Sequence, residues 1–135
     1  MAGYSGTPLW KKLGYQDGTV AYVEKAPANY KGALALPSEI FVKWTERPGA
    51  GIGFVHLFVN SKSQLKKRLL RFRNLMDADG IIWVSWPKKS SGVLTDITED
   101  VVREIALPTG LVDIKVCAVD EIWSGLKLMI RKELR

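Results

Sequence analysis

The residues best suited to bind an anion follow one apolar run of the sequence. Residues 81–86 are apolar apart from one serine, and Pro87 leads from them into the segment KKSSG at residues 88–92. Two ammonium groups, two hydroxyls and the N–H groups of a flexible backbone can donate hydrogen bonds to an anion. In open α/β sheets, ligands bind beyond the carboxyl ends of the strands. The sequence therefore predicts an anion site with an apolar wall, formed by Trp86, Lys88, Lys89, Ser90, Ser91 and Trp123. A solvated surface loop is the alternative.

A second group of cations lies on one predicted helix. Apolar residues recur at three- and four-residue spacing over residues 62–76, which is typical of an amphipathic helix. The other positions of this segment carry six cations and no acidic residue. Such a face either keeps a helix soluble over a sheet or makes salt-dependent contacts to phosphates. The alternative nucleic-acid site therefore consists of Lys62, Lys66, Lys67, Arg68, Arg71 and Arg73.

Groups for nucleophilic or metal chemistry are scarce, because the sequence has one histidine, His56, and one cysteine, Cys117. Each lies in an apolar run, where a hydrogen-bonded core histidine and a small buried cysteine are the usual outcome. A catalytic His–Cys dyad would need both within hydrogen-bond reach. The pair falls short of the usual zinc ligands, and no glycine-rich phosphate-binding motif follows a strand. We therefore predict no catalytic residue, no metal site and no cofactor.

The elements that must position these groups alternate between strands and helices. Apolar and β-branched runs predict strands at 19–23, 40–45, 54–59, 81–86, 111–119 and 126–131. Helices are expected at 9–13, within 26–36, at 62–76 and after Asp96, which is the predicted N-cap. This order predicts one α/β, Rossmann-like domain over residues 1–135, with a mostly parallel sheet, helices on its faces and an antiparallel C-terminal strand pair. Residues 1–6 are predicted to form an arm, and 48–53 a flexible glycine-rich loop.

The composition favours a cytoplasmic location. With 135 residues, of which 47% are hydrophobic and 25% charged, the chain can bury a core and lies far from the disordered class. One cysteine excludes an intrachain disulfide, and no apolar run approaches the roughly 20 residues that span a bilayer. The first residues lack the basic start and apolar stretch of a signal peptide. The formal charge of +6 suits an anionic ligand or partner, although it also attracts nucleic acid.

Three segments of the chain resemble a known family. They are AGYSGTPL at 2–9, WVSWPKKSSG at 83–92 and DIKVCAVDEIWSGLK at 113–127. These segments resemble DUF3052, a family of small bacterial proteins of unknown function, and they extend across nearly the whole chain. The resemblance therefore implies bacterial origin but no activity.

A looser resemblance concerns architecture. The order of runs at 55–59, 65–80, 81–86 and 111–131 is similar to the C-terminal half of S-adenosylmethionine (SAM)-dependent methyltransferases. In that family a glycine-rich loop follows the first strand, where glycine lets the backbone approach the cofactor. This chain has EKAPAN at 24–29 there. The leading hypothesis is therefore a non-catalytic binding or regulatory module for an anionic small molecule or partner. A degenerate methyltransferase-like enzyme and nucleic-acid binding through residues 62–73 are the alternatives.

Overall fold

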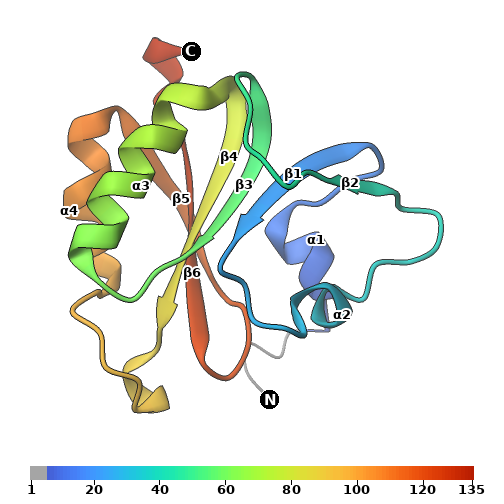
Figure 1. Cartoon of the computed structure of the whole chain (residues 1–135), viewed down its shortest axis with the longest axis horizontal. Coiled ribbons are helices and arrows are strands. Elements are labelled where there is room, and N and C mark those ends of the chain that lie inside the picture. The colour runs from blue at the N-terminus through green and yellow to red at the C-terminus, as the bar shows by residue number, and fades with distance from the viewer. Residues whose placement is uncertain (1–5) are drawn as a thin grey trace.

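The computed structural model describes residues 6–135, which form a six-stranded sheet with helices on both faces (Figure 1). The strands are β1 (Thr19–Glu24), β2 (Val42–Trp44), β3 (Ile52–Phe58), β4 (Met76–Pro87), β5 (Leu111–Ala118) and β6 (Trp123–Ile130). The helices are α1 (Leu9–Leu13), α2 (Tyr30–Leu34), α3 (Lys62–Leu75) and α4 (Glu99–Ala106), with short 3-10 turns η1 (Lys89–Ser91), η2 (Leu107–Thr109) and η3 (Lys132–Leu134). Within the described range, no helix has the length and apolar character needed to cross a membrane. The predicted arm lies outside the described residues except for Gly6.

The strand order is β2-β1-β3-β4-β6-β5. Strands β1 to β4 run parallel, whereas β6 pairs antiparallel with both β4 and β5. The prediction of a mostly parallel α/β sheet with an antiparallel C-terminal pair is confirmed. The order reverses next to β1, because β2 lies on one side of β1 and β3 on the other.

Each face of the sheet has its own hydrophobic core. Helices α3 and α4 cover one face through Leu65, Leu69, Phe72 and Val102, which are all fully buried. Helices α1 and α2 cover the other face (Figure 1). There the fully buried Trp83 donates its indole N–H to the carbonyl of Leu13 at 2.7 Å, so one strand residue fixes the end of α1.

The connection between β2 and β3 leaves part of the sheet without a helix. Parallel strands are usually joined by a crossover of a dozen or more residues, but only residues 45–51 separate these two strands. The register of β2 and β3 against β1 explains why so short a connection can join them. Trp44 at the end of β2 and Phe54 near the start of β3 both lie opposite Ala21 of β1. The connection therefore only steps across β1, and no crossover helix forms over the carboxyl half of β1.

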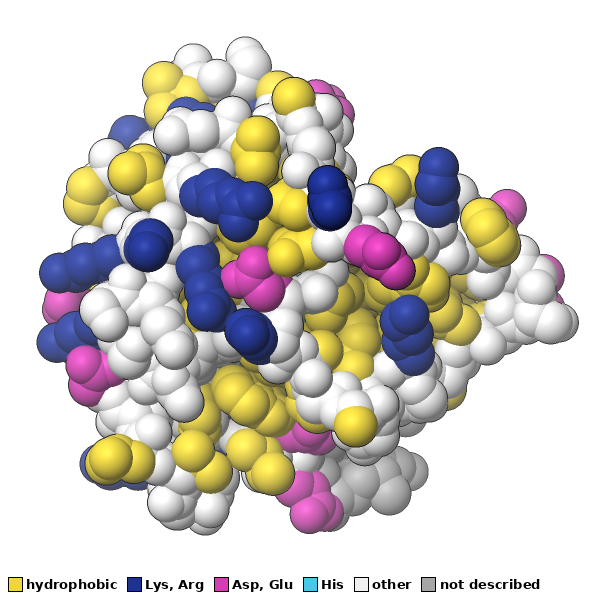
Figure 2. All heavy atoms as spheres, viewed as in Figure 1, with side chains coloured by type: hydrophobic (Ala, Val, Ile, Leu, Met, Phe, Trp, Pro, Cys, Tyr) yellow, Lys and Arg dark blue, Asp and Glu magenta, His cyan; other side chains and the backbone are white. Residues whose placement is uncertain are grey.

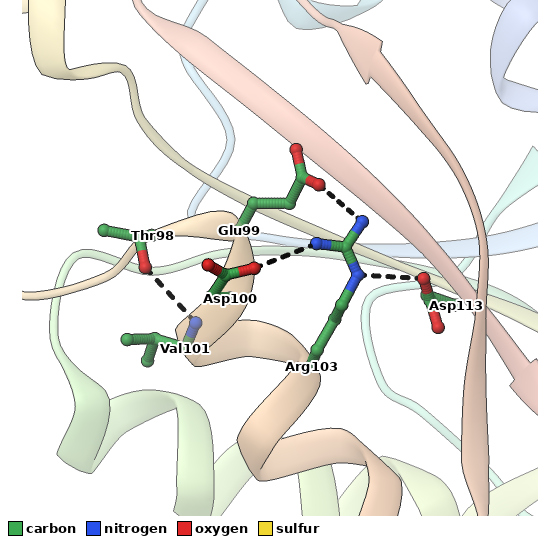
Figure 3. A network of polar contacts seen from close by, with 6 residues as sticks. All are labelled: Thr98, Glu99, Asp100, Val101, Arg103 and Asp113. Atoms are coloured by element: carbon green, nitrogen blue, oxygen red, sulfur yellow. Dashed lines mark hydrogen bonds and ion pairs between the residues drawn. The ribbon is translucent and has the colours of Figure 1, made fainter.

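The two long helices begin with side-chain caps, Ser61 for α3 and Thr98 for α4, and the cap of α4 differs from the one predicted. Thr98 caps α4, since its hydroxyl accepts the N–H of Val101 at 3.2 Å (Figure 3). Asp96, the predicted cap of α4, instead accepts the N–H of Lys62 at 2.8 Å, at the start of α3. The prediction for Asp96 was wrong because its carboxylate reaches a helix start 34 residues earlier in the chain.

One arginine ties α4 to the edge strand β5. The Arg103 guanidinium bonds Asp113 at 2.9 Å and also contacts Glu99 and Asp100 within its own helix (Figure 3). The hydrogen bond from Arg103 is the main reason that the pKa of Asp113 is lowered. This cluster lies on the solvent side of α4 and holds the edge strand to the helix.

Three predicted boundaries shift in the structure. Strand β4 begins at Met76, directly after α3, whereas the predicted helix includes residue 76 and the predicted strand begins at residue 81. Strand β3 begins at Ile52, so Ile52 and Gly53, the last two residues of the predicted loop 48–53, belong to the strand. Strand β6 begins at Trp123, because the Asp120 carboxylate accepts the N–H groups of Ile122 and Trp123 and closes the turn earlier than expected. The pairing of Ile52 with Met76 sets the starts of β3 and β4, and the pairing of Trp123 with Pro87 sets the start of β6.

Candidate functional site

An open cleft of about 1230 Å³ lies at the carboxyl ends of β1 and β2, beside α3. It forms where the strand order reverses and where the short β2–β3 connection leaves β1 without a covering helix. Open α/β sheets bind ligands outside the carboxyl ends of their strands at such a reversal. Figure 2 shows Lys and Arg side chains gathered around acidic and apolar ones on the face that carries α3 and β1. Position and composition both identify this cleft as the candidate binding site.

Glu24, the last residue of β1, has one satisfied and one unsatisfied carboxylate oxygen. Tyr22 donates its hydroxyl to Oε2 at 2.8 Å. The Nε of Arg68 on α3 lies 3.2 Å from Oε1, but its N–H is not directed at that oxygen, which is buried and has no hydrogen bond. The Glu24 side chain is only 14% exposed. Burial, followed by the contact with Glu24, raises the pKa of Tyr22, so this hydroxyl stays a donor.

Cations outnumber acids in the cleft, with five Lys or Arg residues against two Glu residues among those that line it. Arg68 is paired with Glu24. Lys67 and Arg71 lie four residues apart on α3, are exposed, and form no ion pair within residues 6–135, although Arg71 also lies over the Phe72 ring. Opposite them, Lys31 of α2 sits 4.7 Å from the centre of the Trp44 ring. The cleft therefore carries a net positive charge with two cations available to a ligand.

Lys25, which also lines the cleft, has an unusual backbone conformation. Its φ is +62°, in the left-handed region that favours glycine and is uncommon for lysine. The chain makes this turn directly after β1. Residues held in this region cost of order 1 kcal/mol or more and cluster at ligand-binding sites. The loop at 24–29 therefore bends where a glycine would be favoured, yet it presents a lysine side chain.

The predicted anion loop at 88–92 is only partly assembled. The N–H of Lys88 donates to Ile122, and the Ser91 hydroxyl donates to the Lys88 carbonyl at 2.6 Å, so η1 uses Ser91 for its own turn. Lys89 and Ser90 are exposed.

The expected apolar wall of this loop was wrong. Trp86 belongs to the core under α3 and α4, whereas Trp123 packs against Phe58 on the opposite face of the sheet. An anion site at Lys88, Lys89 and Ser90 stays a prediction.

The basic residues of α3 do not share one surface. Lys67, Arg68 and Arg71 line the cleft. Lys62 and Lys66 are exposed outside it. Arg73 donates its Nε–H to the carbonyl of Thr109 at 2.9 Å. The six cations of the predicted nucleic-acid site thus divide into three groups, since a helix of fourteen residues presents every side of its surface.

His56 is a fully buried, hydrogen-bonded residue, as its apolar context predicts. Its Nδ1 lies 2.7 Å from the Tyr30 hydroxyl and its Nε2 lies 2.6 Å from the Ser85 hydroxyl. The Tyr30 hydroxyl lies in turn 2.7 Å from that of Tyr15. Burial lowers the pKa of His56 to about 3, so the ring is neutral at pH 7. Cys117 is half-buried, and burial raises the pKa of its thiol.

Sequence reasoning missed Tyr22, Glu24, Trp44 and Glu46, which line the cleft. One signal could have indicated the acidic pair. In nucleotide-binding α/β folds an acidic residue follows the second strand about 20 residues after the first phosphate-binding turn, and Glu46 follows β2, 22 residues after Glu24. The contact between Tyr22 and Glu24 across alternate strand positions has no comparable signature.

The sequence matches no protein-family model and no curated protein. The resemblance to DUF3052 therefore stays a prediction.

Several solved structures are similar to this chain. A SAM-dependent methyltransferase from Aquifex aeolicus has a TM-score of 0.62 at 12% identity, covering 89% of this chain and 86% of its own. Magnesium protoporphyrin IX methyltransferase (ChlM) from Synechocystis PCC 6803, with bound S-adenosylhomocysteine (SAH), has a TM-score of 0.59 at 10% identity, covering 90% and 78%. LepI in complex with SAH and a substrate analogue has a TM-score of 0.54 at 17% identity. The match covers 91% of this chain but only 39% of LepI. At these identities the likeness concerns fold, so this chain shares the Rossmann-like fold of SAM-dependent methyltransferases.

Proposed function

We propose that this chain is a non-catalytic binding module whose ligand occupies the cleft at the carboxyl ends of β1 and β2. The observation that supports this most strongly is Glu24, which lines the cleft and whose buried Oε1 has no hydrogen bond. A buried polar atom without a partner costs about 1–3 kcal/mol or more when charged. A ligand that donates to this oxygen removes that cost on binding.

The titratable groups most often used in catalysis favour binding over chemistry. The only histidine of the sequence is enclosed by Tyr30 and Ser85 and is neutral. The only cysteine has a raised pKa, which disfavours the thiolate that acts as a nucleophile. Within residues 6–135, no group of three or more His, Cys, Asp or Glu side chains could hold a metal ion.

A cleft-filling substitution tests this proposal. Ser63 is exposed and lines the cleft, so Ser63→Trp should fill it while α3 keeps its cap at Ser61. Lys66→Trp adds the same side chain outside the cleft and is the matched control. The melting temperature is measured with ATP, AMP, polyphosphate and SAH in turn. A ligand at 100 times its dissociation constant stabilises by about 2.7 kcal/mol, equivalent to several degrees.

We expect at least one of these ligands to stabilise the wild type and Lys66→Trp but not Ser63→Trp. Equal stabilisation of both tryptophan variants would move the binding site elsewhere, with Lys88→Ala/Lys89→Ala as the next test. No stabilisation by any ligand would count against the proposal.

Binding of SAM is the second candidate, and the shared fold favours it. The residues after β1 do not fit this cofactor well. Pro27 has no N–H to donate, and Lys25 and the excess of cations oppose the positive sulfonium of SAM. We therefore derive no methyl transfer from this site. Calorimetric titration with SAH decides the matter: binding that Ser63→Trp abolishes would favour the methyltransferase-like alternative.

Nucleic-acid binding is the third candidate, favoured by the exposed cations of α3. Phosphate contacts release counterions, so the affinity for a DNA or RNA oligonucleotide should fall steeply as salt is raised. The double variant Lys62→Ala/Lys66→Ala should weaken that binding without affecting a ligand in the cleft. Affinity that does not change with salt would reject this candidate.

A further inference from the structure

The charges of the cleft point to a more specific ligand than the proposed function requires. Resting on the proposed cleft site, we infer that the ligand is a sugar phosphate: a phosphate ester that also carries hydroxyl groups able to donate hydrogen bonds. Two separate regions of the cleft support this, one that needs a donor and one that needs an anion.

Glu24 forms the region that needs a donor. Its Oε2 is occupied by the Tyr22 hydroxyl at 2.8 Å, and its carboxylate is held in place by Arg68. The remaining oxygen, Oε1, is buried without a hydrogen bond. A carboxylate at neutral pH only accepts hydrogen bonds, so the group that completes this region is a hydroxyl or an amine. An anion alone would be repelled here.

Lys67 and Arg71 form the region that needs an anion. They lie one turn apart on the side of α3 that faces the cleft, and within the described part of the chain neither is neutralised by an ion pair. Lysine and arginine together supply the point charge and the planar donors that a phosphate group accepts. Lys25 adds a third cation from the end of β1.

Arg68 links the two regions. It pairs with Glu24 and lies between Lys67 and Arg71 along α3. Because Arg68 contacts Glu24 and is next to Lys67 in the sequence, the two regions adjoin, and a ligand that spans both carries a phosphate and hydroxyl groups in one molecule. This is the arrangement in a sugar phosphate. Free phosphate would satisfy one region only, and an uncharged sugar the other.

The test compares ribose 5-phosphate with its two halves, ribose and inorganic phosphate, by calorimetric titration of the full chain. We expect the wild type to bind ribose 5-phosphate more tightly than either half. Lys67→Ala/Arg71→Ala should weaken it by about tenfold or more, since two charge-assisted contacts are lost. The matched control, Lys62→Ala/Lys66→Ala, removes the same charge from the same helix outside the cleft and should change the affinity by less than about twofold.

Glu24→Gln separates the two regions. It removes a negative charge, so the affinity for inorganic phosphate should stay equal or rise, whereas the advantage of ribose 5-phosphate over phosphate should shrink. Loss of both affinities in parallel would contradict the role given to Oε1.

The remaining outcomes distinguish the two proposals. If both double alanine variants weakened the binding of ribose 5-phosphate equally, the general surface charge of α3 would explain the binding, and the inference would be overturned. If SAH or ATP binds in a way that Ser63→Trp abolishes but ribose 5-phosphate does not bind, the inference fails and the cleft proposal stands. If ribose 5-phosphate binds equally well to Ser63→Trp, the site is elsewhere and both fail.

Discussion

Two polar regions lie almost back to back on strands β1 and β3, and they differ in how completely their hydrogen bonds are satisfied. Val23 pairs with His56 in the sheet, and Glu24, the next residue of β1, faces the opposite core. On one face Tyr15, Tyr30, His56 and Ser85 form a continuous buried chain. On the other, Glu24 keeps an oxygen without a hydrogen bond near Lys67 and Arg71, which form no ion pair within residues 6–135. Two adjacent positions of β1 thus lie beside different polar regions. Val23 is next to a network in which every member has a partner, which we call the closed network, and Glu24 belongs to a region in which one oxygen has no hydrogen bond.

The difference shows how a structural polar group is distinguished from one available for binding. A buried network in which every member has a partner specifies the packing of a core. A buried group that lacks a partner keeps its desolvation cost until a partner arrives. The first kind should therefore affect stability when changed, and the second should affect binding.

The largest expected effect is in the closed network. His56→Ala removes a fully buried ring and leaves the Tyr30 and Ser85 hydroxyls without their partner. We expect a loss of about 3–5 kcal/mol in the free energy of unfolding, from the cavity and the unpaired groups together. Denaturant titration measures it. A loss below about 1 kcal/mol would show that the chain relaxes around the gap, and would weaken the comparison.

Acid should act on the same residue. The pKa of His56 falls from 6.5 to about 3 on folding, so between these values the unfolded chain binds the extra proton. Stability from this group is complete above about pH 6.5 and is lost as the pH falls toward 3, at about 1.4 kcal/mol per unit. At pH 5 the loss is about 2 kcal/mol relative to pH 7. His56→Gln should lack this part of the pH dependence, and the difference between the two curves isolates it.

The position of a tyrosine in the network should set its contribution. Tyr30→Phe removes a middle member and leaves both His56 Nδ1 and the Tyr15 hydroxyl without a partner, which should cost about 1–3 kcal/mol. Tyr15→Phe removes the end of the chain and should cost about 1 kcal/mol. Equal losses measured by denaturant titration would mean that the network is not continuous.

The smallest effect should have the opposite sign. Lys25→Gly relieves a left-handed backbone position, and we expect a stabilisation of about 0.5–1 kcal/mol with an unchanged dependence on denaturant. It should also weaken binding of ribose 5-phosphate, because a cation of the cleft is lost. A destabilising Lys25→Gly would show that the lysine side chain supports the fold, against the contrast drawn between the two regions.

Much of the fold was predictable from the sequence. The apolar runs at 54–59 and 81–86 indicated buried parallel strands, the spacing of Leu65, Leu69 and Phe72 indicated α3, and the short last connection indicated the antiparallel pair. These features depend on local periodicity, which a sequence carries directly. The start of β4 was not predicted: Met76 was assigned to the helix, because its strand partner Ile52 of β3 lies more than twenty residues away in the sequence.

The cleft was much less accessible to sequence reasoning. It depends on where β2 ends along the sheet relative to the start of β3. The register of both strands against β1 sets these two positions. Likewise Lys62, Lys66, Lys67 and Arg71 look alike in sequence, and only the rotation of α3 against β1 divides them between the cleft and the outer surface. The pairing of Trp86 and Trp123 failed for a similar reason, since adjacent antiparallel strands place them on opposite faces.

The short connection between β2 and β3 also makes this fold easy to extend. Arg47, Gly49 and Ala50 are exposed at its tip, where added residues would disturb no strand pairing. Loop-closure entropy grows slowly with length, so doubling the connection costs only about 0.6 kcal/mol. A protein of this kind can therefore acquire a lid over its ligand by insertion at a single point of the chain, and specificity can evolve there while the sheet stays unchanged.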